Sequence, residues 1–355
     1  MRKNIFKKAL FVMLVTVLTI SLAACGNSSQ NQADNSESLP DEINFGILRV
    51  PNDETIAMVE GYFDDYFTDK GIETKFTVFD SGAEANQALA SDSIDFATMG
   101  NINSVTALSR DLGVELIWIH ETLGEIEALA VREGSGINEV SDLAGKRVAV
   151  PFASTCHYVL LNAIKDAGIA GEVQLLDMKT SEIVAAWQRG DINAAYTWQP
   201  SLGKLYEDNG VPLITSKEMA EKGYVTANVD VVKKDFADKY PELVTDFITL
   251  LAKAGDIYRN DPERGAEIVS QKLSITADEA LNQMQGSTWH TKEELLSDRF
   301  FGTSDNPGEF AKIMKETSDF LVEQDSLDYS PSQEEFNQYV NPEFIEKSLE
   351  QMEGK

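Results

Sequence analysis

The chain has 355 residues, of which 59 are acidic and 30 are basic, and its formal net charge at pH 7 is -29. Nucleic-acid phosphates repel so acidic a chain, which excludes nucleic-acid binding as its function. Hydrophobic residues make up 43% of the chain, so it can bury a sizeable core, and its length predicts two lobes.

The first residues predict export and anchoring to a membrane. Basic residues precede an apolar stretch from Ala9 to Leu22, which is the pattern of a signal peptide and is too short to span a bilayer. The sequence Leu-Ala-Ala-Cys that ends at Cys25 resembles a lipobox, and this resemblance implies cleavage before Cys25 and a lipid on its sulfur. We expect residues 1–24 to be a lipoprotein signal peptide and residues 25–41 a disordered tether, with the chain lipid-anchored at the outer face of the cytoplasmic membrane.

Short strands alternate with helices from Ile43 onward, which indicates βαβ units around a mainly parallel sheet. The first series of predicted elements is strand Ile43–Val50, helix Glu54–Lys70, strand Glu73–Phe79, helix Ala83–Ala90, strand Ile94–Met99, helix Val105–Leu112, and strands Glu115–His120 and Ile126–Arg132. The second series is strand Arg147–Phe152, helix Tyr158–Ala167, strand Val173–Leu176, helix Ser181–Arg189, and strands Ala194–Thr197, Val211–Ile214 and Val229–Lys233. Beyond Pro241 the pattern predicts helices Glu242–Arg259, Pro262–Leu273, Ala277–Gln285 and Glu309–Gln324.

The two series predict an α/β fold with two lobes and a cleft between them. Lobe I is expected to comprise residues 42–128 and 230–355, and lobe II residues 129–229, with two extended crossings joining them. Ligands of open α/β sheets bind beyond the carboxyl ends of the strands. The loops expected at the cleft are therefore Asp80–Ala83, Gly100–Ser104, Ala153–His157 and Thr197–Pro200.

Hydroxyl groups in these loops predict an anion site. Ser154 and Thr155 follow a short apolar strand and precede a helix, and the free N–H groups and dipole of a helix start favour a negatively charged oxygen. An ordinary capped helix is the alternative reading of the same residues. Tyr158 begins the helix beside them, where its hydroxyl can bind an oxyanion or satisfy a neighbouring carbonyl.

Three further residues are candidates for the cleft. Trp198 follows a strand, so it is expected at the cleft mouth, where an aromatic plane can pack against an alkyl chain or an ammonium group. Glu127 and Asp230 lie at the two predicted crossings and can pair with a cationic ligand group. The alternative for both carboxylates is a solvated position or a bond to interlobe backbone.

Enzymatic and metal sites find little support in the sequence. His120, His157 and His290 are scattered without metal-ligand spacing, and no catalytic or nucleotide-binding motif occurs. With Cys25 lipidated, Cys156 has no partner for an intrachain disulfide. We expect a binding protein without catalytic residues, metal or cofactor.

Three segments together resemble the taurine-binding subfamily of ABC-transporter substrate-binding proteins, within the wider aliphatic sulfonate and nitrate group. They are GKRVAVPFASTCHY, AAWQRGDINAAYTW and VVKKDFADKYPELV, and the resemblance runs from about Ile43 to Phe344. It implies a type II periplasmic-binding-protein fold, a monomer that closes its lobes on a sulfonate, taurine foremost, and delivery to a membrane permease with an ATPase.

The resemblance also implies a ligand site. It places around the sulfonate Ser81, Gly82, Asn101, Ser154, Thr155 and Tyr158, with Glu127 and Trp198 nearer the amine. One departure concerns the amine: related taurine binders tend to have an Asp where this chain has Asn228, and Asp230 on the same strand face can substitute for it. Residues 100–102, Gly-Asn-Ile, also differ from the expected Gly-Ser-Ser.

The alternatives are a nitrate-binding or pyrimidine-precursor-binding protein, an enzyme of the pyrimidine-precursor synthase type, and a surface protein that partners a sensor. A secreted lipoprotein without clustered histidines or cysteines argues against the enzyme.

Overall fold

The computed structural model of the protein describes residues 38–353, so the predicted signal peptide, Cys25 and most of the predicted tether lie outside the described residues. Residues 40–353 belong to one compact unit, which contains two large β-sheets, of six and five strands, and one two-stranded hairpin. No helix among residues 38–353 combines the length and the apolar character that crossing a membrane requires.

The first sheet has the strand order β11-β4-β10-β3-β1-β2 in the described chain. Its strands are β1 (Glu42–Leu48), β2 (Glu73–Phe79), β3 (Phe96–Gly100), β4 (Val114–Leu123), β10 (Ala227–Lys233) and β11 (Ser287–Thr288). The pairings show that β1 to β4 share one direction, whereas β10 and β11 run the opposite way. We call this sheet and its helices lobe I.

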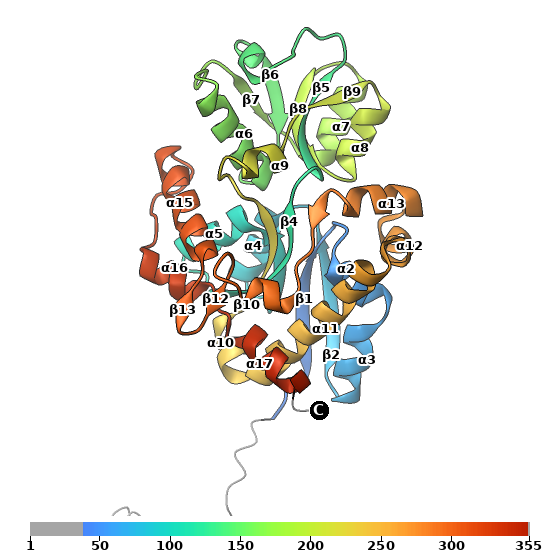
Figure 1. Ribbon diagram of the computed structural model, residues 1–355, viewed down its shortest axis with the longest axis vertical. Coiled ribbons are helices and arrows are strands. Elements are labelled where there is room, and N and C mark those ends of the chain that lie inside the picture. The colour runs from blue at the N-terminus through green and yellow to red at the C-terminus, as the bar shows by residue number, and fades with distance from the viewer. Residues whose placement is uncertain (1–37, 354–355) are drawn as a thin grey trace, which may run out of the picture. The chain divides into compact units, whose positions relative to one another are not determined.

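The second sheet, with its helices, is lobe II and has the order β7-β6-β8-β5-β9. Its strands are β5 (Glu127–Arg132), β6 (Arg147–Val150), β7 (Gln174–Asp177), β8 (Ala194–Trp198) and β9 (Gly210–Thr215). Only β5 runs against the others in this described sheet. Figure 1 shows the two lobes joined where β4 leads into β5 and where the chain returns from α9 to β10.

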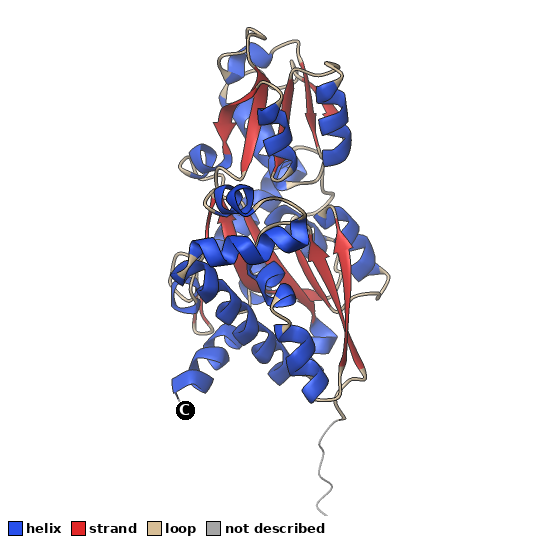
Figure 2. Cartoon of the chain, turned by 90° about the vertical axis from the view of Figure 1, so that its right-hand side faces the viewer, coloured by secondary structure: helices blue, strands red, loops and turns tan. Residues whose placement is uncertain are grey.

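Helices cover both faces of each sheet, so the fold is α/β as the alternating pattern predicted (Figure 2). In lobe I they are α2 (Asp53–Val59), α3 (Tyr62–Asp69), α4 (Gly82–Ala90), α5 (Asn101–Ser109), α10 (Lys234–Lys239), α11 (Pro241–Asn260), α12 (Pro262–Leu273), α13 (Ala277–Met284), α14 (Lys292–Leu295), α15 (Glu309–Glu323), α16 (Gln333–Tyr339) and α17 (Glu343–Glu353). In lobe II they are α6 (Thr155–Asp166), α7 (Thr180–Gln188), α8 (Ser201–Glu207) and α9 (Ser216–Ala220), with a 3-10 turn at Val140–Leu143. A small hairpin joins β12 (Gly302–Thr303) to β13 (Asn306–Pro307).

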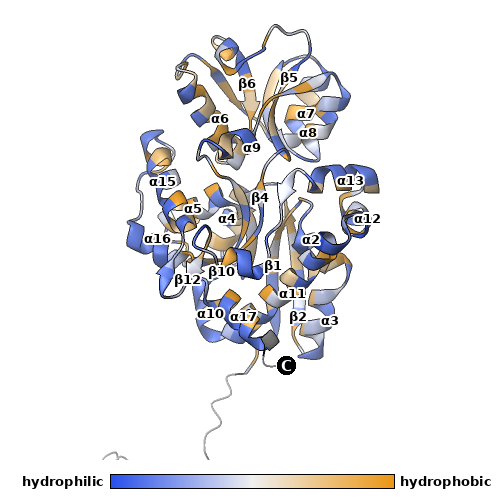
Figure 3. Cartoon of the chain, viewed as in Figure 1, coloured by the Kyte–Doolittle hydropathy of each residue, from blue (hydrophilic) through white to orange (hydrophobic). Residues whose placement is uncertain are grey.

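The core of lobe I is built on aromatic side chains. Phe45 on β1 stacks on Phe63 and Phe247, with ring centroids 5.6 and 5.4 Å apart, and Phe96 on β3 lies 4.6 Å from Phe247. Such rings contribute large buried apolar areas, which hold α3 and α11 against the sheet. Figure 3 shows this division as hydrophobic colour in the sheets and hydrophilic colour on the outer helices such as α12 and α16.

One predicted helix is divided in two. The sequence pattern predicted a single helix over Glu54–Lys70, but Gly61 adopts the left-handed conformation with φ of 75° and separates α2 from α3. Glycine has no Cβ and enters this conformation at little cost, so the break falls there. The break lets α3 begin at Tyr62 and pack Phe63 and Phe67 into the core.

Candidate functional site

A pocket lies between the two lobes and encloses about 530 Å³ of atom-free space, part of it open to solvent. Its walls come from the β2–α4, β3–α5 and β6–α6 turns, from the β4–β5 crossing, from the end of β8 and from the start of β10. Of the residues predicted for the site, those that line this pocket are Ser81, Gly82, Glu127, Ser154, Thr155, Trp198 and Asn228.

The β2–α4 turn brings a helix start to the pocket. Ser81 caps α4, because its hydroxyl accepts a hydrogen bond from the Glu84 N–H at 3.4 Å. Gly82 follows, and a Cβ at that position would lie 2.5 Å from the Asn103 amide oxygen. Only a glycine therefore allows the Asn103 side chain to pack so closely against the start of α4.

The β3–α5 turn contributes Asn103, which the sequence reasoning missed. Asn103 lines the pocket and donates from Nδ2 to the Ala153 carbonyl of lobe II at 2.7 Å. Asn101, the predicted residue, faces elsewhere: its side chain accepts from the Ala227 N–H at 3.2 Å and donates to the Val225 carbonyl. Those partners are more than 120 residues away in the chain, so the loop sequence alone carried no signal for choosing between the two asparagines.

The β6–α6 turn brings a third helix start. The Ser154 hydroxyl accepts from the His157 N–H at 3.2 Å and donates to the Pro151 carbonyl at 2.6 Å, which caps α6. Burial lowers the pKa of His157 to about 4, so this imidazole is neutral at pH 7 and adds no positive charge. Tyr158 does not line the pocket, because its ring packs edge-on against Phe320 with centroids 5.5 Å apart.

Three helices, α4, α5 and α6, therefore start at one pocket. The first backbone N–H groups of each helix lack intrahelical acceptors, and the helix dipole places partial positive charge there. Among the described residues that line the pocket there is no lysine or arginine. The pocket can thus hold an anion through backbone N–H groups, the Ser81 hydroxyl and the second amide proton of Asn103, because the hydroxyl protons of Ser154 and Thr155 already bond the Pro151 carbonyl and Glu127.

Glu127 is the carboxylate of the pocket wall, and it is 2% exposed. It accepts from the Thr155 hydroxyl, from the Ser216 hydroxyl at 2.8 Å and from the Thr226 hydroxyl at 3.3 Å. Burial raises the pKa of Glu127, and these hydroxyl bonds oppose that rise. Both oxygens are already engaged, so the predicted pairing of Glu127 with a ligand cation would have to compete with these donors, and it stays a prediction.

Trp198 stands opposite Glu127 in the pairing of β5 with β8. Paired residues of neighbouring strands project from the same face, which brings both side chains to the pocket. Trp198 is half-buried there and can cover a bound ligand with its ring.

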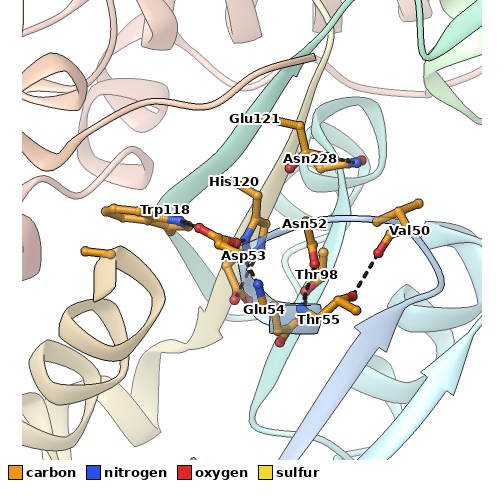
Figure 4. Close-up of polar contacts among 12 residues, drawn as sticks. Val50, Asn52, Asp53, Glu54, Thr55, Thr98, Trp118, His120, Glu121 and Asn228 are labelled. Carbon is orange, nitrogen blue, oxygen red and sulfur yellow. Dashed lines mark hydrogen bonds and ion pairs between the residues drawn. The ribbon is translucent and has the colours of Figure 1, made fainter. Parts of the chain in front are cut away.

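Asn228 lines the pocket from β10 and is bonded to a buried acid behind it. Its Nδ2 donates to Glu121 Oε1 at 2.5 Å, and Glu121 is fully buried (Figure 4). The second oxygen of Glu121 has no hydrogen-bond partner. Burial raises the pKa of this carboxyl to about 8, against a weaker lowering by His120. The sequence reasoning missed Glu121, although His120 and Glu121 interrupt an otherwise apolar strand end.

Asp230 lies deeper in the same strand and does not line the pocket. It faces His120, whose Nε2 is 3.6 Å away and whose Nδ1 contacts Asp53 at 2.5 Å. Burial alone would lower the pKa of His120, but Asp53 and Asp230 outweigh it and hold that pKa well above the usual value. The sequence predicted that Asp230 takes over the ammonium contact of an acid at position 228. Asp230 is instead paired with His120 inside lobe I, so it would have to leave this partner to reach a ligand.

The chain belongs to the NMT1/THI5-like family, whose model matches residues 56–265. Its two-lobed fold is that of the periplasmic binding proteins, as the crystal structure of the periplasmic aliphatic sulphonate-binding protein of Escherichia coli shows: the TM-score is 0.69 at 17% identity, over 84% of this chain and 92% of that one.

Among curated proteins, the chain is similar to the taurine-binding periplasmic protein of Escherichia coli K12. The two are 34% identical over 285 residues, which cover 78% of this chain and 85% of the relative. The fold is shared with an enzyme as well: a desulfurization enzyme superimposes with a TM-score of 0.65 at 19% identity, over 88% of this chain and all of that one.

No group of three or more histidine, cysteine or acidic side chains in residues 38–353 is arranged to hold a metal ion. Cys156, beside the pocket on α6, is fully buried, and burial together with Glu127 raises the pKa of its thiol well above the ordinary value. A thiol in that state is a poor nucleophile.

Proposed function

We propose that this protein is the substrate-binding component of an ABC importer and captures taurine or a related alkanesulfonate between its lobes. The observation that carries the proposal is the meeting of three helix starts at one pocket without a cationic side chain among the described residues that line it. Family membership and the 34% identity to a taurine-binding protein support it.

A sulfonate suits this pocket because it spreads one negative charge over three oxygens. Each oxygen can accept from the backbone N–H groups of a different helix start, with the Ser81 hydroxyl and the second amide proton of Asn103 nearby. An anion at a helix start gains about 0.3–1 kcal/mol at exposed sites and up to about 2 kcal/mol when partly buried. Lobe closure would exclude water and strengthen these bonds.

The ligand-binding set proposed here is Ser81, Gly82, Asn103, Ser154, Thr155, Trp198 and Asn228, with Glu127 holding the Thr155 hydroxyl in place. Asn101, Tyr158 and Asp230 are left out because none of them lines the pocket. For the two lobes we propose the limits 42–128 with 230–355, and 129–229, shifted by two to three residues at the crossings so that β5, from Glu127, belongs to lobe II and β10, from Ala227, to lobe I.

The proposed partners are a membrane permease and its ATPase, and the protein acts without chemistry of its own. We further propose a lipid anchor at Cys25 that keeps the protein at the outer face of the cytoplasmic membrane, on the strength of the sequence around that cysteine. Mass spectrometry of the protein purified from its native membrane tests this anchor: an unmodified N-terminus at Met1 would contradict it.

Isothermal titration calorimetry with taurine, ethanesulfonate, nitrate and a hydroxymethylpyrimidine tests the ligand class. We expect heat with the two sulfonates and none with the pyrimidine. A folded protein that gives no heat with either sulfonate would refute the proposal, and binding of nitrate or the pyrimidine in their place would select one of the alternatives.

A further inference from the structure

We propose that Asn228 and Glu121 form the ammonium-binding end of the pocket: Asn228 contacts the ligand's ammonium group, and Glu121 supplies the negative charge behind it. This inference rests on the proposed function, because it distinguishes an aminosulfonate such as taurine from a plain alkanesulfonate. Asn228 is thus a specificity residue, and Glu121 is its positioning residue.

A β-bulge places Glu121 behind Asn228. Asn228 on β10 pairs with Glu121 on β4 and Val229 pairs with Ile119, so His120 is the extra, unpaired residue. A bulge changes the direction in which neighbouring side chains project. Here two consecutive residues reach buried partners, His120 the carboxylate of Asp53 and Glu121 the amide of Asn228 (Figure 4).

The bond to Glu121 determines which end of the Asn228 amide is available to a ligand. In the structure the NH2 group of Asn228 faces Glu121 Oε1, and once Glu121 is ionised this is the only orientation that bonds it, because a carboxylate only accepts hydrogen bonds. The Asn228 carbonyl oxygen then faces away from Glu121. A carbonyl oxygen is an acceptor for an ammonium group. Asn228 therefore presents an acceptor oxygen to the pocket that it lines, and the buried Glu121 carboxylate behind it favours a cation there.

Glu121 needs such a ligand to be stable in its ionised form. It is fully buried, and its Oε2 has no hydrogen-bond partner. A buried charge without full pairing is unfavourable, so a cation nearby stabilises it. The anion end, at the starts of α4, α5 and α6, offers the complementary partial charge, which makes the pocket suited to a zwitterion.

The titratable groups around Glu121 are mostly acids. Those that act on Glu121 directly are the acids Asp53 on α2 and Glu127 on β5 and the cation His120 on β4. Two further acids, Glu54 on α2 and Asp230 on β10, act on the same His120. Acids raise the pKa of Glu121 and His120 lowers it, with burial the largest cause of its value of about 8. At pH 7 Glu121 is consequently mostly protonated in the free protein, and an arriving ammonium group should release that proton.

Glu127 is less suited to the ammonium group. Its oxygens already accept from the hydroxyls of Thr155, Ser216 and Thr226. Glu121 has one oxygen without any partner and a single amide donor on the other.

The test is isothermal titration calorimetry of the full chain with taurine and with ethanesulfonate, which differ by the ammonium group. Titrations in buffers of different ionisation enthalpy measure the protons released. For taurine we expect release of nearly one proton at about pH 6–7, falling to about half a proton near pH 8, and affinity that rises up to about tenfold per pH unit over that range. Ethanesulfonate should release none.

Glu121→Gln should abolish the proton release, remove the pH dependence and weaken taurine by about tenfold or more near pH 8. It should leave ethanesulfonate binding intact, which also reports that the variant is folded. Asn228→Leu should lower the taurine-to-ethanesulfonate affinity ratio in the same way.

The matched control is Glu115→Gln. Glu115 is another buried glutamate of β4, bonded by the Asn341 amide at 3.0 Å, and it does not line the pocket. This variant should keep both the proton release and the ligand ratio.

Taurine binding without proton release, or an unchanged ligand ratio in Glu121→Gln, would overturn this inference while leaving sulfonate capture in place. The same holds if Glu115→Gln changes the ratio as much as Glu121→Gln does. Failure of both sulfonates to bind the folded wild-type protein would instead overturn the proposed function, and the inference with it. If Glu121→Gln does not fold, the wild-type proton count and Asn228→Leu decide.

Discussion

Replacing Glu121 by glutamine should change how the stability of the free protein depends on pH. Burial raises the pKa of Glu121 from 4.5 to about 8 in the folded chain. Between about pH 4.5 and about pH 8, the folded state therefore keeps a proton on Glu121 that the unfolded chain has lost. The contribution of Glu121 to wild-type stability therefore falls as the pH rises from about 4.5 to about 8, whereas glutamine at this position makes no such contribution.

The size of the effect follows from the same values. A tenfold change in proton affinity is worth about 1.4 kcal/mol, so ionising Glu121 in place costs on the order of 5 kcal/mol above pH 8. The glutamine side chain would keep an oxygen to accept from the Asn228 amide, which now bonds Glu121 Oε1 at 2.5 Å. We expect the variant to gain several kcal/mol of stability relative to the wild type between about pH 5 and about pH 9.

Urea unfolding of the ligand-free protein at pH 5, 7 and 9 measures this change. Glu125→Gln is the control: Glu125 lies four residues further along, with 61% of its side chain exposed, and its replacement should change stability by no more than about 0.5 kcal/mol. The reasoning fails if the stabilities of wild type and Glu121→Gln differ by the same amount at pH 5 and at pH 9.

Three further variants test the pocket. Ser154→Ala removes the hydroxyl that accepts from the His157 N–H and should lower the free energy of unfolding in urea by about 1 kcal/mol. Ser201→Ala is the control, because Ser201 begins α8, which has no side-chain cap bond. An unchanged unfolding midpoint in Ser154→Ala would contradict the cap. Glu127→Gln should weaken taurine and ethanesulfonate by similar factors in calorimetry, because it disturbs the Thr155 hydroxyl at the anion end; a loss confined to taurine would instead support an ammonium contact. Trp198→Phe should abolish the ligand-induced change in tryptophan fluorescence, and a persisting change would place the ligand elsewhere.

The fold class followed from local patterns because each element carries its own signal. The apolar alternation of Glu73–Phe79 matches β2 residue for residue, and the small polar residues after such strands gave the turns. The α/β fold could thus be predicted from the sequence. The break at Gly61 was missed because one glycine inside a helical pattern is tolerated in most helices.

The loops of the pocket could be predicted, but the orientation of several side chains could not. Ser81 and Ser154 cap the helices that follow their strands, a purely local property. Asn101 instead bonds Val225 and Ala227 at the start of β10, and Tyr158 packs on Phe320 of α15. Both choices depend on chain segments more than a hundred residues away.

Glu121 was missed for a different reason. The position of its side chain depends on the bulge at His120, which appears only when β4 is paired with β10. A strict two-residue alternation would put these neighbours on opposite faces of the sheet.

The bond from Asn103 to the Ala153 carbonyl spans the pocket, since Asn103 starts from lobe I and Ala153 belongs to lobe II. A Cβ on Gly100 would lie 2.8 Å from the Thr155 methyl, so the lobes meet closely here. Parting them wide enough to free a ligand must break this bond whatever ligand is present. This bond therefore slows the dissociation of every ligand in the same way. Loss of the Asn103 amide should raise the dissociation rates of taurine and ethanesulfonate by the same factor.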